Sequence, residues 1–280
     1  MGWRLRITHR THVAYEGSAR ASYNEARMTP RTLPRQTALL TSVSVDAQAT
    51  IWTYEDYWGT AVSSFDVQAA HPKLLITARS TVETSPAGAL AAPLPWTALG
   101  ERAGDGRLLE YLQPTTRTTV SPDLARAARQ RIAGADPLEA AADLARWVNE
   151  RVAYVPGSTG VQTSAQEAWE LGSGVCQDIA HLTVALLRAT GIPARYVSGY
   201  LYPQLDAEPG DEVEGQSHAW VEYWTGQWQA CDPTNQAAVG ERHVVVAAGR
   251  DYADVPPLKG IYSGAPGSSM DVTVSLTRVA

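Results

Sequence analysis

The segment between Gly172 and Gly191 constrains the fold most, because it joins a glycine turn to a stretch that is apolar around most of a helix. Its apolar residues include Ile179, Leu182, Val184, Leu186 and Leu187. A helix with this pattern has to be buried. Gly191 can take the left-handed conformation that follows a last helical turn, and Pro193 disfavours continuation. The sequence therefore predicts a central buried helix that ends near position 190.

Cys176 stands at the start of this helix. The first N–H groups of a helix have no intrahelical acceptor, and the helix dipole favours negative charge there. A thiol at this position is biased toward the thiolate, which is the nucleophilic form. Asp178, two residues later, works against that bias. Cys176 is thus the candidate nucleophile.

Composition narrows the class of protein. A chain of 280 residues can form one large domain or two ordinary ones, and its two cysteines, Cys176 and Cys231, are too few for a disulfide framework. Neither a signal peptide nor an apolar run of about twenty residues is evident, so we expect a cytoplasmic location and no membrane partner. The net charge of −6 without a large basic block argues against nucleic acid as a partner.

Residues 1–85 have the pattern of β-strands. Trp3, Leu5, Ile7, Val13 and Tyr15 occupy odd positions, and the even positions from Arg4 to His12 are basic or polar, which predicts a strand with one solvated face. Further strands are predicted at residues 20–28, 36–45, 49–57, 61–67 and 74–83. Their spacing favours an antiparallel sandwich or barrel. We expect an N-terminal β-domain over residues 1–85.

The rest of the chain is expected to form a connector at 86–120, a catalytic core at 121–262 and a C-terminal strand at 263–280, whose partner the sequence does not reveal. The core begins with helices. Asp136 is a predicted N-cap before Pro137, and Thr163 with Gln166 forms a plausible capping box for a short helix. Strands follow at 194–202, 217–224 and 227–232, which together give an α+β layout.

His218 and Asp232 lie at equal distances from position 225, beside a turn signal at Thr225-Gly226. In an antiparallel hairpin, residues equidistant from the turn centre face each other and project from the same face. This holds only if the connection has an odd number of residues or a bulge. A two-residue turn would place His218 opposite Pro233 and send Asp232 to the other face.

With that register, the three residues can perform covalent acyl chemistry. Cys176 attacks an amide carbonyl, His218 pairs with the thiolate as an imidazolium and protonates the leaving nitrogen, and Asp232 orients the imidazole. The backbone N–H of Cys176 is placed to stabilise the oxyanion, an effect worth roughly 3 kcal/mol per donor in other systems. The sequence does not identify a second donor.

Four blocks within residues 140–236 resemble, in the right order, the core of the bacterial transglutaminase-like family, whose members are often described as candidate cysteine proteases. The blocks are Gly174-Val175-Cys176-Gln177-Asp178, Gly191-Ile192-Pro193-Ala194-Arg195-Tyr196-Val197-Ser198-Gly199-Tyr200, Ser217-His218-Ala219-Trp220-Val221-Glu222 and Asp232-Pro233-Thr234-Asn235. The β-rich segment before them, with Asp56 to Gly59, is similar to the N-terminal domain that accompanies this core.

The resemblance implies a papain/transglutaminase-like core, with helices against an antiparallel sheet, preceded by an all-β sandwich-like domain. It implies that Cys176, His218 and Asp232 stand at the positions of the nucleophile, the base and the orienting acid. It does not decide whether the acyl group passes to water or to an amine.

Other polar residues have structural interpretations. His181 and Cys231 are expected in the core, and Arg195 and Asn235 are expected to be structural hydrogen-bonding residues. A zinc site built from the cysteines and histidines lacks the usual ligand spacing, so we predict no metal and no cofactor. The acidic run 206–214 is expected to be a solvated loop that could border the cleft and attract basic substrates.

The predicted function is hydrolysis of peptide or carboxamide bonds in a peptide or protein substrate, since water needs no second binding site. Two alternatives stay open: transfer of the acyl group to an amine, and a binding module that has kept the fold without activity. The sequence does not indicate an oligomeric state.

Overall fold

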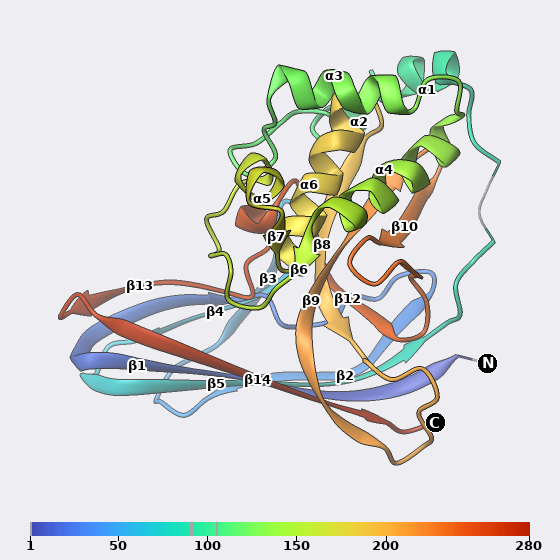
Figure 1. The fold of residues 1–280 in the computed structure, drawn as a ribbon. Helices are drawn as coiled ribbons and strands as arrows, with labels where there is room; N and C mark the ends of the chain where they lie inside the picture. Colours follow the sequence, from blue (N-terminus) through green and yellow to red (C-terminus); the bar gives the residue numbers. More distant parts are fainter. Residues whose placement is uncertain (1, 90–91, 105) are drawn as a thin grey trace.

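The computed structural model describes residues 2–89, 92–104 and 106–280. It has mixed helices and strands in an α+β arrangement, as expected. A long curled antiparallel sheet forms the lower part of the molecule in Figure 1, and the helices gather above it. None of the helices in these described ranges is long and apolar enough to cross a membrane.

The N-terminal strands match the predicted runs closely, with one difference. They are β1 (Trp3–Ala26), β2 (Gln36–Val45), β3 (Trp52–Glu55), β4 (Ala61–Val67) and β5 (His71–Thr84). The first two predicted strands are a single strand, β1, whose register with β5 shifts between Ala14 and Ala19. Gly17 has a φ of 79°, a conformation that glycine adopts readily, so the chain bends there without ending the strand.

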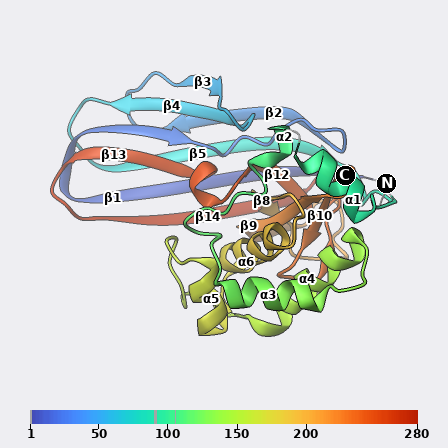
Figure 2. The same ribbon diagram turned by 90° about the horizontal axis from the view of Figure 1, so that it is seen from above.

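The sheet curls over a small core of its own. The first half of β1 lies between β5 and β14 (Ser268–Arg278), and its second half lies between β4 and β13 (Leu258–Gly264). Met28, Phe65 and Ile76 are among the buried residues inside the curl. Figure 2 shows these strands stacked beside the helical part, which gives the region its sandwich-like form.

The C-terminal strand finds two partners that the sequence did not reveal. β14 pairs with residues Leu5–Tyr15 of β1. It also pairs with the first four residues of β9 (Glu212–Trp224). Through this strand the N-terminal sheet continues into the sheet of the core. The domain boundaries remain a prediction. The expected connector contains α1 (Trp96–Ala103) and α2 (Gly106–Leu109), while its residues 90–91 and 105 lie outside the described part.

Four helices precede the core sheet: α3 (Pro122–Arg131), α4 (Pro137–Arg151), α5 (Ala165–Leu171) and α6 (Cys176–Ala189). The predicted cap of α4 is confirmed, because Asp136 accepts from the backbone N–H groups of its first turn and Glu139 completes a capping box. The predicted cap of α5 is wrong by one residue, because Ser164 and Glu167 form the box instead of Thr163 and Gln166.

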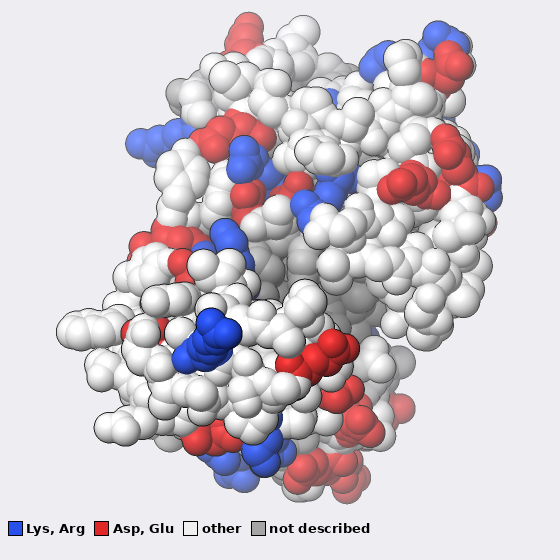
Figure 3. Space-filling view, turned by 90° about the vertical axis from the view of Figure 1, so that its left-hand side faces the viewer, with Lys and Arg blue, Asp and Glu red and all other residues white. Residues whose placement is uncertain are grey.

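The core sheet consists of β8 (Ala194–Leu201), β9, β10 (Trp228–Asp232), β11 (Ala237–Ala238) and β12 (His243–Gly249). It packs against α6, whose residues Gln177–Arg188 are all buried. The sequence analysis missed β12 and β13. A short 3-10 helix at Tyr252–Asp254 follows β12. On the face drawn in Figure 3, Lys and Arg side chains are interspersed with Asp and Glu.

Candidate active site

Cys176 is the first residue of α6, and a tight turn holds it there. Gly172 has a φ of 68°, and the two residues after it form β7 (Ser173–Gly174), which pairs with β6 (Ala153–Tyr154). The Asp178 carboxylate accepts from the Val175 N–H at 2.8 Å and so closes the first turn of the helix. Burial raises the pKa of Asp178, although hydrogen bonds from Thr159 and Val175 act in the opposite direction.

The hairpin that carries His218 and Asp232 has a three-residue turn, Thr225 to Gln227. Its register pairs Trp228 with Trp224 and Cys231 with Val221. Continuing this register places Asp232 opposite Trp220, so the expectation that it lies directly opposite His218 is wrong. Because the connection is odd in length, His218 and Asp232 still project from the same face, offset by two residues.

This diagonal offset allows a direct contact. Nε2 of His218 lies 2.8 Å from Oδ2 of Asp232, and both side chains are buried. Burial alone lowers the pKa of His218, but hydrogen bonds and charge interactions with Asp232 and Cys176 outweigh it and raise the pKa to about 9. The structure thus joins His218 to Asp232 by a direct hydrogen bond, and Cys176 is close enough to act on the pKa of His218.

The Asp232 carboxylate is held on both oxygens. Oδ1 accepts from the backbone N–H groups of Thr234 and Asn235, each at 3.1 Å, in a tight turn after β10. Oδ2 accepts from His218, from Nδ2 of Asn235 at 2.8 Å and from Nε2 of His243 at 3.2 Å. Burial opposes ionisation, but these bonds outweigh it and hold the pKa of Asp232 far below its usual range. Asn235, expected to be structural, is part of the site.

His243 is the site residue that the sequence analysis missed. It begins β12, which pairs with β8 and not with either strand of the hairpin. The run Val244-Val245-Val246 is a signal for a strand there, but no local pattern indicates that its first side chain reaches Asp232.

The buried indole of Trp220 packs against the rings of His218 and His243. Its ring centroid lies 6.0 Å from that of His218, with the planes 30° apart, and 5.3 Å from that of His243. Gly199 pairs with His218 across β8 and β9, and a Cβ on Gly199 would lie 2.6 Å from the Trp220 ring. Gly199, which belongs to the second motif block, therefore leaves the space that the Trp220 indole occupies.

A cleft of about 400 Å³ opens beside His218. Its lining includes Tyr154, Gln216, Thr234 and Asn235. Glu214 also lines it, but this residue belongs to β9 and not to a loop, so the acidic run ends as a strand. Burial and the neighbouring Cys176 raise the pKa of Tyr154. His218 is thus reached from the surface through this cleft.

The two residues expected in the core lie there. His181 is fully buried, and its Nε2 accepts from the Tyr252 N–H at 3.1 Å. Cys231 alternates with Asp232 along β10 and packs against the main core, where burial raises the pKa of its thiol to about 12. Cys231 is thus a poor competitor of Cys176 for electrophiles.

His218, Asp232 and His243 are the group whose ligand atoms, among the described residues, lie close enough together to hold a metal ion. The distance of 2.8 Å from His218 to Asp232 is shorter than the roughly 3.3 Å that separates two ligands of a tetrahedral zinc. These atoms already satisfy one another by hydrogen bonds. The geometry fits a hydrogen-bonded network better than a metal centre.

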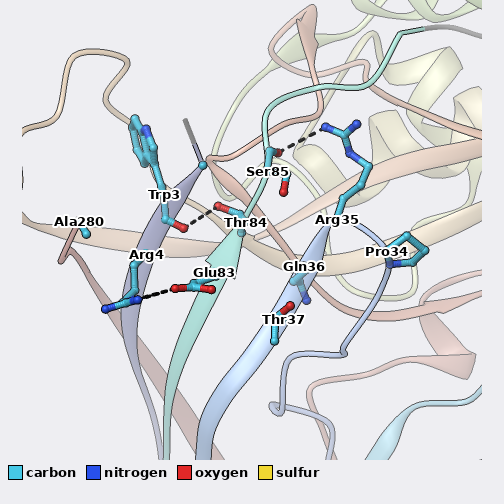
Figure 4. Close-up of a pocket in the computed structure, with 11 residues that line it drawn as sticks. Trp3, Arg4, Pro34, Arg35, Gln36, Thr37, Glu83, Thr84, Ser85 and Ala280 are labelled. Atoms are coloured by element: carbon cyan, nitrogen blue, oxygen red, sulfur yellow. Dashed lines mark hydrogen bonds and ion pairs between the residues drawn. The ribbon is translucent and has the colours of Figure 1, made fainter.

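A second hollow, of about 360 Å³, lies where the ends of β1, β2 and β5 meet (Figure 4). Its polar groups are engaged within the protein. Arg4 pairs with Glu83, and the Thr84 hydroxyl donates to the Glu241 carbonyl at 2.6 Å. None of its lining residues belongs to the group around Cys176.

Comparison with known proteins places this geometry in a family. A model of the transglutaminase-like superfamily core matches residues 125–233, and a model of the bacterial transglutaminase-like N-terminal region matches residues 5–83. An uncharacterised protein of Mycobacterium leprae is 46% identical over 278 residues, which cover 99% of this chain and 100% of the relative.

Two further relatives are more distant. A protein-glutamine gamma-glutamyltransferase of Pseudomonas aeruginosa is 35% identical over 139 residues, which are 45% of this chain and 20% of that enzyme. The crystal structure of a candidate cysteine protease from Cytophaga hutchinsonii matches with a TM-score of 0.82 at 22% identity, over 100% of this chain and 92% of that one, and so shares the fold. The chain belongs to the transglutaminase-like superfamily and carries the N-terminal region of its bacterial members.

Proposed function

We propose that the protein is a thiol-dependent acyl-transfer enzyme that acts on peptide or carboxamide bonds through Cys176, His218 and Asp232. The observation that carries the proposal is the buried imidazole of His218, which interacts with Cys176 on one side and bonds Asp232 on the other. An imidazolium held in this way pairs with a thiolate and can later supply a proton.

The reaction has two covalent steps. The Cys176 thiolate forms a bond to the carbonyl carbon, and the resulting oxyanion is stabilised by the backbone N–H of Cys176, which has no intrahelical acceptor. His218 gives its proton to the nitrogen as the C–N bond breaks, which releases an amine and leaves a thioester on Cys176. Water then gives a proton to His218 and attacks the thioester, which releases the carboxylic acid and regenerates the Cys176 thiolate beside the protonated His218.

Hydrolysis is the favoured outcome because the cleft beside His218 is open to water and the reaction needs no second substrate site. Transfer to an amine is the second candidate, supported by the Pseudomonas relative named as a protein-glutamine gamma-glutamyltransferase. In that case a primary amine replaces water in the second step.

Thiol labelling tests the nucleophile without knowledge of the substrate. Iodoacetamide at pH 7 should modify Cys176 faster than Cys231 by at least about tenfold, read by mass spectrometry of the digested protein. His218→Ala should slow the labelling of Cys176 by at least about tenfold, whereas His181→Ala, which removes a buried histidine outside the hydrogen-bonded group, should not. Equal labelling of the two cysteines in the wild type would favour a binding module without activity.

Product analysis separates the two reactions. A peptide library containing glutamine should be incubated with the protein, with and without an added primary amine, and Cys176→Ser should serve as the control. New peptide termini or a mass gain of one unit at glutamine indicate hydrolysis. A mass gain equal to the amine less ammonia indicates transfer.

A further inference from the structure

Three side-chain donors approach one oxygen atom in the site. Oδ2 of Asp232 accepts from His218 at 2.8 Å, from Asn235 at 2.8 Å and from His243 at 3.2 Å. A carboxylate oxygen offers two lone pairs, so three donors share them and each bond is weaker than it would be alone. The proton affinity of His218 therefore depends on the other two donors, which act on it through the carboxylate.

The hydrogen bonds of His243 indicate where its proton sits. The N–H of Gly240 donates to Nδ1 of His243 at 3.4 Å, which requires an unprotonated Nδ1. The proton is then on Nε2, which faces Asp232. Burial lowers the pKa of His243 and outweighs the hydrogen bond and the charge of Asp232, which act to raise it, so the ring is neutral at pH 7.

We propose that His243 is a positioning residue of the reaction, which acts through Asp232 by donating a permanent hydrogen bond to the oxygen that His218 also uses. The inference rests on the proposed function, because His218 has to carry a proton for it to matter. His243 is not among the residues that line the cleft, and its ring is buried edge-on against Trp220, so it acts without touching substrate.

The role follows from how the carboxylate charge is shared. His218 needs a proton to pair with the thiolate, but it also has to release that proton to the leaving nitrogen. A neutral donor that bonds Oδ2 reduces the negative charge that the carboxylate presents to His218. It therefore lowers the pKa that His218 would otherwise have. The polar and charged groups that act on His218 and His243 are Asp232 at the end of β10, Asn235 in the turn after it, Cys176 on α6 and Arg242 before β12.

Two substitutions separate this role from simple packing. His243→Leu removes the donor and keeps an apolar side chain in the buried space. His243→Gln keeps an N–H group at the position of Nε2. The titration of His218 should be followed by NMR of protein labelled in the histidine rings. We expect His243→Leu to raise the pKa of His218 by about half a unit or more, and His243→Gln to restore it toward about 9.

The matched control is His9→Leu, because His9 is also buried and hydrogen-bonded but contacts Tyr200 and not Asp232. It should lower stability without moving the titration of His218. If His243→Leu does not fold, His243→Asn takes its place, since its amide is too short to reach Oδ2. A His218 titration that is unchanged or lowered in the donor-free variant, while the fold is intact, overturns the inference.

Thiol labelling keeps this result distinct from the proposed function. If Cys176 of the wild type reacts no faster than Cys231, the proposed function fails. Suppose instead that Cys176 reacts faster than Cys231 and that its rate depends on His218, but that the pKa of His218 is the same with and without His243. The proposed function then stands, and only the role of His243 is lost.

Discussion

Nδ1 of His9 lies 2.9 Å from the hydroxyl of Tyr200, which joins β1 of the N-terminal sheet to β8 of the core. The second nitrogen of the same ring lies 3.1 Å from the Thr11 hydroxyl. Both nitrogens are thus engaged in a buried place where an extra proton finds no charged partner. This one contact between the two parts of the molecule is made by a neutral ring.

Acid should lower the free energy of unfolding of the protein by favouring protonation of His9. Burial lowers the pKa of His9 from 6.5 to about 4, so the unfolded chain binds the proton more readily than the folded one. The stabilising effect is fully present above pH 6.5 and is lost as the pH falls through about 4, a loss on the order of 3 kcal/mol.

Urea unfolding followed by tryptophan fluorescence at pH 7, 5.5 and 4 measures this loss. His9→Gln keeps hydrogen-bonding groups but does not titrate, so its acid loss should be smaller. An equal loss in the variant and the wild type would contradict the assignment to His9.

Alkali should lower the free energy of unfolding by removing a proton from His218. The pKa of His218 is raised from 6.5 to about 9, so the folded chain holds this proton more tightly than the unfolded one. The stabilising effect is fully present below pH 6.5 and is lost as the pH rises through about 9. The size is again on the order of 3 kcal/mol.

Unfolding free energies measured between pH 6.5 and 9 test this. The wild type should lose stability across that range, whereas His218→Gln should start lower and stay nearly level. A wild type whose stability is constant from pH 6.5 to 9 would show that the His218–Asp232 pair is not charged in the way described.

The parts of the site that could be predicted are those with local signals. The apolar period of α6 and the glycines at its ends located Cys176 at a helix start, and the motif blocks indicated which histidine and aspartate belong with it. The predicted hairpin register was wrong only in its centre, which was placed at Thr225, whereas the three-residue turn from Thr225 to Gln227 is centred on Gly226.

The parts that could not be predicted depend on distant segments. The alternation in β14 was visible, but its partners lie more than 250 residues away in β1 and about 60 residues away in β9. His243 reaches Asp232 only because the chain after β11 returns to pair with β8. Nothing near His243 in the sequence encodes that return.

Gly199 should be intolerant of a side chain. A Cβ there would lie 2.0 Å from the Val244 carbonyl oxygen and 2.6 Å from the Trp220 ring, so β8, β12 and the Trp220 indole would all have to shift. Gly199→Ala should cost about 3 kcal/mol and slow the labelling of Cys176.

Gly160→Ala is the matched control, since no atom lies within 4 Å of its added Cβ and its φ is not in the left-handed region. It should change stability by less than about 0.5 kcal/mol. Similar effects of the two substitutions, measured by thermal unfolding, would mean that the packing around Gly199 relaxes freely.

Arg188 should be the most costly single charge to remove from the core. Its guanidinium is buried in the last turn of α6 and donates to the backbone carbonyls of Ala194 and Arg250 and to that of Gln113. It therefore ties the helix that carries Cys176 to the start of β8, to the end of β12 and to the segment before α3. Burial lowers its pKa only to about 10, so it remains charged at pH 7.

Arg188→Met keeps the length of the side chain but leaves these buried carbonyls without their donor, at a cost of about 3–5 kcal/mol. Arg129→Met is the control, because Arg129 is exposed and donates to the Ala189 carbonyl alone, so its loss should cost less than about 1 kcal/mol. Thermal unfolding compares the two. Equal effects would mean that water replaces the buried guanidinium, and that α6 is held to the sheet by its apolar face without help from this cation.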